Sequence, residues 1–195
     1  ASHAEGKDTN SNGSYSHAEG NSCSTTGSYA HAEGRFTSAF GASSHAEGNL
    51  TVTRAAYSHA EGESTEIPVS AVAAHAEGQS TIASESYSHA EGHNTRAKGV
   101  YSHAEGSGST ASGHSSHAEG HLTEASGIAA HSQGKSTLAQ GNYSFASGHN
   151  TVATQSYQTV VGAYNVSASL PDNSYFVVGG GTNNTFRENL AVFAS

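Results

Sequence analysis

The polar and apolar positions of this chain alternate strictly, and the alternation returns at a short, regular interval. In each repeat a small residue precedes His, Ala, Glu and Gly, as in Ser16–Gly20. Further along the repeat, two small residues flank a variable one, as in Thr37, Ser38 and Ala39. Alternation with period two is typical of strands with one buried face. We therefore predict two strands per repeat, with Ser, Ala, Gly and Thr on the inner side and His, Glu and the variable residue outside.

The repeats, counted from the small residue before His, begin 14 residues apart between Ser2 and Gln158, except that 16 residues separate Ser58 from Ala74. A short fixed period indicates a solenoid, in which each coil packs mainly on its neighbours. Gly recurs at the fifth and twelfth positions, where tight turns are needed. The sequence thus predicts an all-β, parallel β-roll solenoid of 14-residue coils over residues 1–157, with an irregular coil at 58–73.

The last repeats change character before the chain enters a different kind of segment. Phe145 and Val161 stand where earlier repeats have His and Glu, and the string SYFVVGGG follows at Ser174–Gly181. Terminal repeats of solenoids need a cap that closes the open end. We therefore predict that residues 158–195 form a final coil and a cap of one or two strands, with Arg187 and Glu188 as a salt bridge within it.

Composition narrows the classes of partner. A net charge of −9 with seven Lys and Arg disfavours nucleic acid and anionic membrane surfaces. No apolar stretch is long enough to insert into a membrane. With 34% apolar residues and no Trp or Met, the core must be narrow or shared between copies of the chain. The single cysteine, Cys23, stands at a Thr position and is interpreted as a small buried filler.

The repeated His and Glu are the candidate chemistry of the chain. A catalytic acid and base need a pocket and an individual environment, whereas HAEG occurs in nine equivalent copies. We therefore predict no catalytic residue and no cofactor, and we interpret the two columns as a structural ladder at a subunit interface. The ladder comprises His3, Glu5, His17, Glu19, His31, Glu33, His45, Glu47, His59, Glu61, His75, Glu77, His89, Glu91, His103, Glu105, His117, Glu119 and His131.

Two other functions stay open: metal binding by the His and Glu columns, and ice binding by the Thr column. Imidazoles and carboxylates bind Zn or Ni, but HAEG alone does not supply a closed set of ligands, so no metal site is predicted. A Thr column turned outward would suit ice binding, but it would bury Glu66 and Arg96 in a thin core. If His and Glu pair at an interface, acidification through the carboxylate range is expected to loosen the assembly.

The repeat, Ser-x-Ala-x-Gly followed by Thr/Ala-x-Ala-x-Gly, resembles the head repeat of YadA-like trimeric adhesins. The SHAEG spelling is similar to repeat arrays of phage tail and neck-appendage proteins that precede an autocleaving chaperone domain of the peptidase G2 type. The resemblance implies a left-handed β-roll assembled as a homotrimer. This chain departs from the adhesin unit because His and Glu replace its Val and Ile. The cleaving domain is not in this sequence, so no autoprotease activity is expected.

These features together predict a structural, receptor-binding segment of a phage tail fibre, extracellular on the virion, that attaches to a glycan or protein receptor on a host cell. The candidate receptor-facing residues lie in the irregular coil: Ile67, Pro68, Val69 and Val72. The alternatives are the head of a bacterial cell-surface adhesin and a spacer whose binding domain lies elsewhere. A depolymerase would need carboxylates clustered in a groove, and those outside the ladder are few and scattered.

Overall fold

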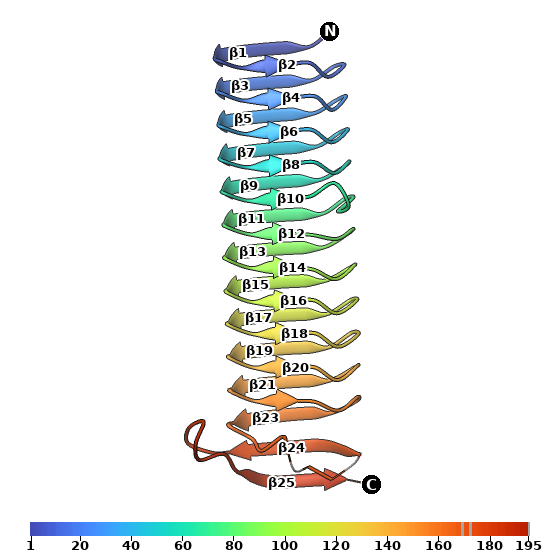
Figure 1. Ribbon diagram of the computed structural model, residues 1–195, viewed down its shortest axis with the longest axis vertical. Coiled ribbons are helices and arrows are strands. Elements are labelled where there is room, and N and C mark those ends of the chain that lie inside the picture. Colours follow the sequence, from blue (N-terminus) through green and yellow to red (C-terminus); the bar gives the residue numbers. More distant parts are fainter. Residues whose placement is uncertain (169, 172, 195) are drawn as a thin grey trace. The chain divides into compact units, whose positions relative to one another are not determined.

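The computed structural model describes residues 1–168, 170–171 and 173–194 of the chain. These residues form two compact units, 1–101 and 102–195, which are described separately (Figure 1). Each unit is a parallel β-solenoid with coils of about 14 residues, and the described residues contain no helix. The prediction of an all-β solenoid is confirmed. No helix long and apolar enough to cross a membrane is present among the described residues.

Each coil of the first unit contributes one strand of five residues and one of two residues. The long strands are β1 (His3–Lys7), β3 (His17–Asn21), β5 (His31–Arg35), β7 (His45–Asn49), β9 (His59–Glu63), β11 (His75–Gln79) and β13 (His89–His93). The short strands are β2 (Asn10–Ser11), β4 (Ser24–Thr25), β6 (Ser38–Ala39), β8 (Val52–Thr53), β10 (Glu66–Ile67), β12 (Ile82–Ala83) and β14 (Arg96–Ala97).

The second unit continues the same alternation and ends in two longer strands. Its coils contain β15 (His103–Ser107), β16 (Thr110–Ala111), β17 (His117–His121), β18 (Glu124–Ala125), β19 (His131–Lys135), β20 (Leu138–Ala139), β21 (Phe145–His149), β22 (Val152–Ala153) and β23 (Thr159–Ala163). The final pair is β24 (Ser174–Gly180) and β25 (Asn189–Ala194).

Within each unit the coils stack in a register that places identical residues side by side. His17 pairs with His31 in the first unit, and His117 pairs with His131 in the second. The irregular coil keeps this register, since His59 pairs with His75 despite the two extra residues between them. The second strand of each coil has only two residues, because the chain turns directly after positions nine and ten.

The interior is a thin layer of small side chains. The Ala at position three and the residues at positions eight and ten are buried, as Ala32, Thr37 and Ala39 illustrate, while Ser38 between them is partly exposed. The Ser at position one is also buried, and its hydroxyl donates to a carbonyl three residues back, as from Ser16 to Gly13. Cys23 is buried as well, so its interpretation as a filler is confirmed.

The coil corners use backbone conformations that most residues avoid. Positions seven and fourteen have positive φ although, apart from Gly108, they are not Gly; examples are 59° at Ser22 and 60° at Tyr29. There the amide continues the stacking bonds, since Tyr29 N–H donates to the Ser14 carbonyl one coil earlier at 2.8 Å. Gly at position five also has positive φ, 113° at Gly20, and is exposed at the corner rather than facing inward as predicted.

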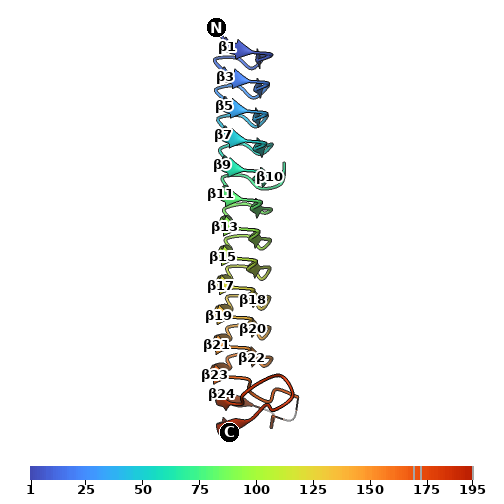
Figure 2. The same cartoon turned by 90° about the vertical axis from the view of Figure 1, so that its left-hand side faces the viewer.

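The two extra residues of the irregular coil enlarge one turn, at residues 68–73. Figure 2 shows the chain bulging outward after β10. Ala71 is buried beneath this turn, and Ser70 and Ser86 anchor it to the next coil: the Ser70 hydroxyl donates to Ser84, and the Ser86 hydroxyl donates to the Ser70 carbonyl. The enlarged turn is therefore a fixed projection, and the coils on either side keep their pairing.

The second unit closes with two strands, the upper number that the sequence predicts. β24 pairs in parallel with β23, and β25 pairs antiparallel with β24. The predicted salt bridge is wrong: no ion pair among the described residues joins Arg187 to Glu188. The Arg187 guanidinium instead donates to the carbonyls of Asn150 and Asn165. A planar cation with several donors suits carbonyl groups left free where the coil ladder ends.

Substitution of a glycine at position twelve tests how tightly the coils stack. A Cβ added at Gly27 would lie 1.9 Å from the carbonyl oxygen of Gly41 in the next coil. Since that neighbour is backbone, it cannot rotate away, and we expect Gly27→Ala to lower the free energy of unfolding by about 3 kcal/mol. The control is Ala55→Gly at the same position, expected to change it by less than about 1 kcal/mol. Equal urea midpoints for the two variants would contradict this account.

Candidate functional site

The ladder face is the outer side of the long strands, formed by the side chains at positions two and four of each coil. Alternation places it opposite the buried Ala column, so the predicted outward direction of His and Glu is confirmed. In the inner coils of each unit these side chains are 31% to 40% exposed. Each unit therefore presents two parallel columns, one of imidazoles and one of carboxylates.

The imidazoles of the ladder face stack on one another. In the first unit the rings of His31 and His45 lie 4.7 Å apart with an interplanar angle of 6°, and His45 and His59 lie 4.8 Å apart at 3°. In the second unit the rings of His103 and His117 are 4.7 Å apart. The spacing equals that of neighbouring strands, so backbone pairing sets the stacking directly.

His and Glu of the same coil are close, but they do not form regular hydrogen bonds. The Nε2 of His45 lies 3.6 Å from a carboxylate oxygen of Glu47, and the other inner coils of the first unit are similar. The contact is a hydrogen bond at His3 and Glu5, where it measures 3.3 Å. Nε2 is shielded from solvent and makes no hydrogen bond within the described residues at His17, His31, His45, His59, His75, His117 and His131.

A groove follows the carboxylate column of the first unit. It has a volume of about 630 Å³ and is lined by Glu47, Glu61 and Glu77 together with the glycines that follow them in each coil. The groove exists because position five carries no side chain beside the carboxylates. It runs along several adjacent coils rather than around a single residue.

The pKa values of Glu47 and His45 are shifted by burial and by their neighbours in the two columns. Partial burial, together with the carboxylates of Glu61 and Glu33 on the adjacent coils, raises the pKa of Glu47 to about 7. Partial burial lowers the pKa of His45, and the neighbouring imidazoles of His59 and His31 lower it further. Both shifts favour uncharged side chains. At this coil the side chains therefore tend towards a neutral imidazole beside a protonated carboxyl group. In the second unit the pKa of Glu119 is lowered instead, because the effect of burial is outweighed by a hydrogen bond with Glu105 and by the imidazoles of His117 and His131.

These shifts act on stability in opposite directions. Glu47 holds its proton more tightly when folded, so its contribution falls as the pH rises from 4.5 through about 7. His45 resists protonation when folded, so its contribution falls as the pH drops below 6.5. The expected loosening by acid thus has the predicted sign for His45 and the opposite sign for Glu47.

The geometry disfavours metal binding by the His and Glu columns and ice binding by the Thr column. Ligand atoms of His45, Glu47 and His59 lie within 4.8 Å of one another. However, two nitrogens on one Zn are at most about 4.2 Å apart, and parallel stacked rings do not aim their lone pairs at a common point. Ice binding by the Thr column is excluded in the inner coils, because Thr51 and Thr81 are fully buried.

The enlarged turn places the other candidate residues differently from one another. Val69 is 74% exposed at its tip, and Val72 is 37% exposed. Pro68 is half-buried, and Ile67 is fully buried. Ile67 therefore does not face a receptor: it occupies position ten of its coil, on the inner side of β10. The prediction missed this because it treated Ile67 as part of the insertion rather than counting its position.

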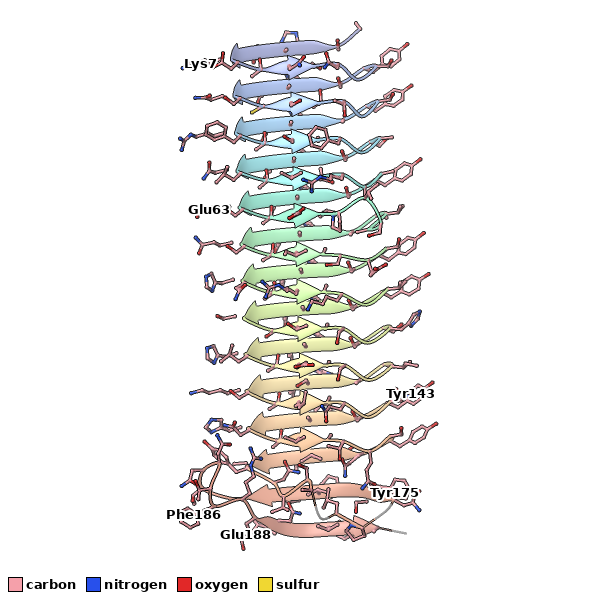
Figure 3. The ribbon with its side chains drawn as sticks, in the orientation of Figure 1. Lys7, Glu63, Tyr143, Tyr175, Phe186 and Glu188 are labelled. Atoms are coloured by element: carbon pink, nitrogen blue, oxygen red, sulfur yellow. The ribbon has the colours of Figure 1, made fainter. Side chains whose placement is uncertain are left out.

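Tyrosines form a second exposed column at position fourteen. Tyr15 stacks on Tyr29 with ring centroids 5.2 Å apart, and Tyr143 stacks on Tyr157 at the same distance. These rings are exposed and project from the corner of the coil, as Figure 3 shows for Tyr143. Lys7 and Glu63 project outward from position six of their coils in the same figure. The ladder face is thus flanked by corners whose side chains project into solvent and stack along the column.

The ladder face becomes apolar towards the end of the second unit, which sequence reasoning interpreted only as a cap. In register with His131 come Phe145, Thr159 and Phe176, and β25 then adds Phe193. The signal was in the sequence, because Phe176 occupies the position of His within SYFVVGGG. It was missed because Phe176 follows Thr159, its partner in β23, by 17 residues instead of 14, so the repeat count breaks there.

Comparison with known protein families finds no family model that matches the chain, and no curated protein matches it.

The opposing pH effects can be separated by one substitution. Glu47→Gln removes the carboxyl group whose pKa is raised. The free energy of unfolding of the variant minus that of the original chain is therefore expected to be about 1 kcal/mol higher at about pH 8 than at about pH 5, allowing for solvent screening. Urea midpoints at the two pH values measure the difference. The matched control is Glu124→Gln, an exposed carboxylate at position nine. A Glu47→Gln effect that is equal at both pH values would show that the column does not perturb this group.

Proposed function

We propose that the chain is a structural segment of a homotrimeric surface fibre, of the kind found in phage tails, that binds a receptor on a host cell. Its role is attachment by multivalent display rather than turnover, and it acts outside the cell as part of a virion. The observation that carries the proposal is the ladder face, which is uniform from coil to coil although it faces away from the core. A left-handed β-roll and the resemblance to YadA-like heads belong to the same proposal.

The state of the ladder face supports a partner with the same periodicity. Its side chains are about one third exposed, and Nε2 atoms such as that of His45 are shielded without a hydrogen bond. Since Nε2 is already covered within the chain, the exposed remainder of each side chain is the part that meets a partner, and this part recurs at one strand spacing. A second and third copy in the same register would repeat the contact at every coil.

A polar interface of this kind favours specificity over strength. Desolvating His and Glu offsets most of the gain from pairing them, so such networks contribute little net stability. They do penalise misalignment, because only a shift by whole coils restores the pairing. The irregular coil removes part of that remaining degeneracy, since its enlarged turn at 68–73 differs from every other turn in the described residues.

The enlarged turn supports the receptor-binding part of the proposal. Val69 is exposed at the tip of a turn that Ser70 and Ser86 hold in place. An exposed apolar residue on a rigid projection is typical of binding surfaces, and loops on regular scaffolds commonly carry recognition. Pro68 and Val72 flank the tip and complete the candidate surface.

The assembly is tested by removing imidazoles from adjacent coils. The triple variant His31→Ala, His45→Ala and His59→Ala is expected to lower the thermal midpoint of the assembled protein by at least about 5 °C, because it leaves the carboxylates of those coils covered at the interface without their partners. The control replaces Ser24 and Ser38 at the variable position by Ala, and should leave the midpoint unchanged. Sedimentation velocity follows the oligomeric state. An unchanged midpoint in the triple variant would overturn the assignment of the ladder face to an interface.

Receptor binding is tested with the chain itself, using host-cell adsorption and a glycan array. Val69→Asp should reduce binding at least about tenfold, because it places a charge at the centre of the contact. The control is Tyr15→Ser, a comparably exposed side chain outside the enlarged turn. Binding that survives Val69→Asp would move the receptor surface elsewhere on the chain. No binding by the unaltered chain to any host surface would favour a spacer.

A further inference from the structure

The ladder face of the second unit changes from polar to apolar in one direction along the chain. At position two the sequence of side chains is His131, Phe145, Thr159 and Phe176. At position four Glu119 is followed by Gln133, Ser147, Val161 and Val178. The antiparallel partner β25 extends the two columns with Phe193 opposite Phe176 and Ala191 opposite Val178.

The apolar end of the ladder face consists of Phe145, Val161, Phe176, Val178 and Phe193. Phe193 is 61% exposed and Phe176 is 38% exposed, and their rings lie 5.9 Å apart on the same side of the hairpin. They do not belong to the core of the solenoid, which is filled on the other side of β24 by the fully buried Val177. Large apolar side chains in a cluster exposed to solvent indicate a surface that binds something.

We infer that the apolar end of the ladder face is the association nucleus of the assembly, and that its occupant is the same surface of other copies of this chain, aligned in parallel. The inference rests on the proposed function, because it takes the ladder face as the contact between copies. Under it, the apolar end supplies most of the association free energy, and the His and Glu columns supply register.

Continuity identifies the occupant. Four of the five apolar residues occupy, in register, the same two columns as His117 and Glu119, and Phe193 extends one of these columns on the antiparallel strand β25. A partner that covers the ladder face of this unit must therefore match polar coils and an apolar end in a fixed order. A parallel copy of the chain has that order, and it places Phe176 and Phe193 against the same residues of the other copies.

The apolar end and the His and Glu columns contribute differently to association. Paired His and Glu are a weak source of affinity because both must be desolvated. Buried aromatic side chains dominate the energetics of most interfaces. Register follows from where the nucleus lies: once the apolar ends of the copies meet, each coil faces its counterpart. A ladder of identical coils has no other feature in this unit that distinguishes one alignment from the next.

The test compares Phe193→Ser with the unaltered chain by sedimentation velocity over a range of concentrations. We expect the concentration of half-association to rise by at least about 30-fold, the effect of losing one strong interface anchor. The matched control is Tyr157→Ser, which removes an equally exposed aromatic ring at position fourteen of the same unit. It should change the half-association concentration by less than about threefold.

Two further measurements keep the result interpretable. Phe193→Leu retains an apolar side chain and should restore association to within about fivefold of the unaltered chain. Circular dichroism and hydrogen exchange of the β19 and β21 amides establish that the coils remain folded in each variant. Association of Phe193→Ser as strong as that of the unaltered chain overturns the nucleus and leaves the proposed function standing. An unaltered chain that is monomeric at every concentration overturns the proposed function, and the nucleus with it.

Discussion

Backbone stacking of one coil on the next is the constraint on which every other feature depends. The coils are one strand spacing apart, so each side chain lies beside its equivalent in the next coil. Whatever a position contains is therefore multiplied into a column. Small residues are required where columns face each other across the thin interior, and Gly is required where a Cβ would meet the next carbonyl, as at Gly27. The residue at position nine can vary in size because it faces outward.

Stacking also creates the electrostatic problem of the ladder face. Partial burial raises the pKa of Glu47, and repulsion from the carboxylates one strand spacing away on either side raises it further. The neighbouring imidazoles offset part of that repulsion, but burial lowers the pKa of His45 and His59 at the same time. The protonation of Glu47 therefore depends on the carboxylates of Glu33 and Glu61 on the adjacent coils.

Most of the fold could be predicted because periodicity reveals which positions are equivalent. Alternation separated the inner Ala32, Thr37 and Ala39 from the outer His, Glu and position nine. Prediction failed where equivalence breaks. Ile67 was assigned to the insertion although it is the last inner residue before it, and Phe176 was assigned to a cap although it continues the His column. Arg187 was given a charged partner next to it in sequence, whereas its partners are carbonyls from earlier coils that no local pattern indicates.

The enlarged turn at 68–73 has a consequence for how such a chain can change over time. Two residues more than the repeat allows are accommodated there, while His59 and His75 keep their pairing and Ala71 remains buried beneath the turn. At this corner the length of the loop can therefore change without changing the alignment of the coils. New segments can enter the chain at this corner without altering the scaffold, in the manner of an insertion point. Recognition can diverge there while the repeat itself stays under the strict limits of stacking.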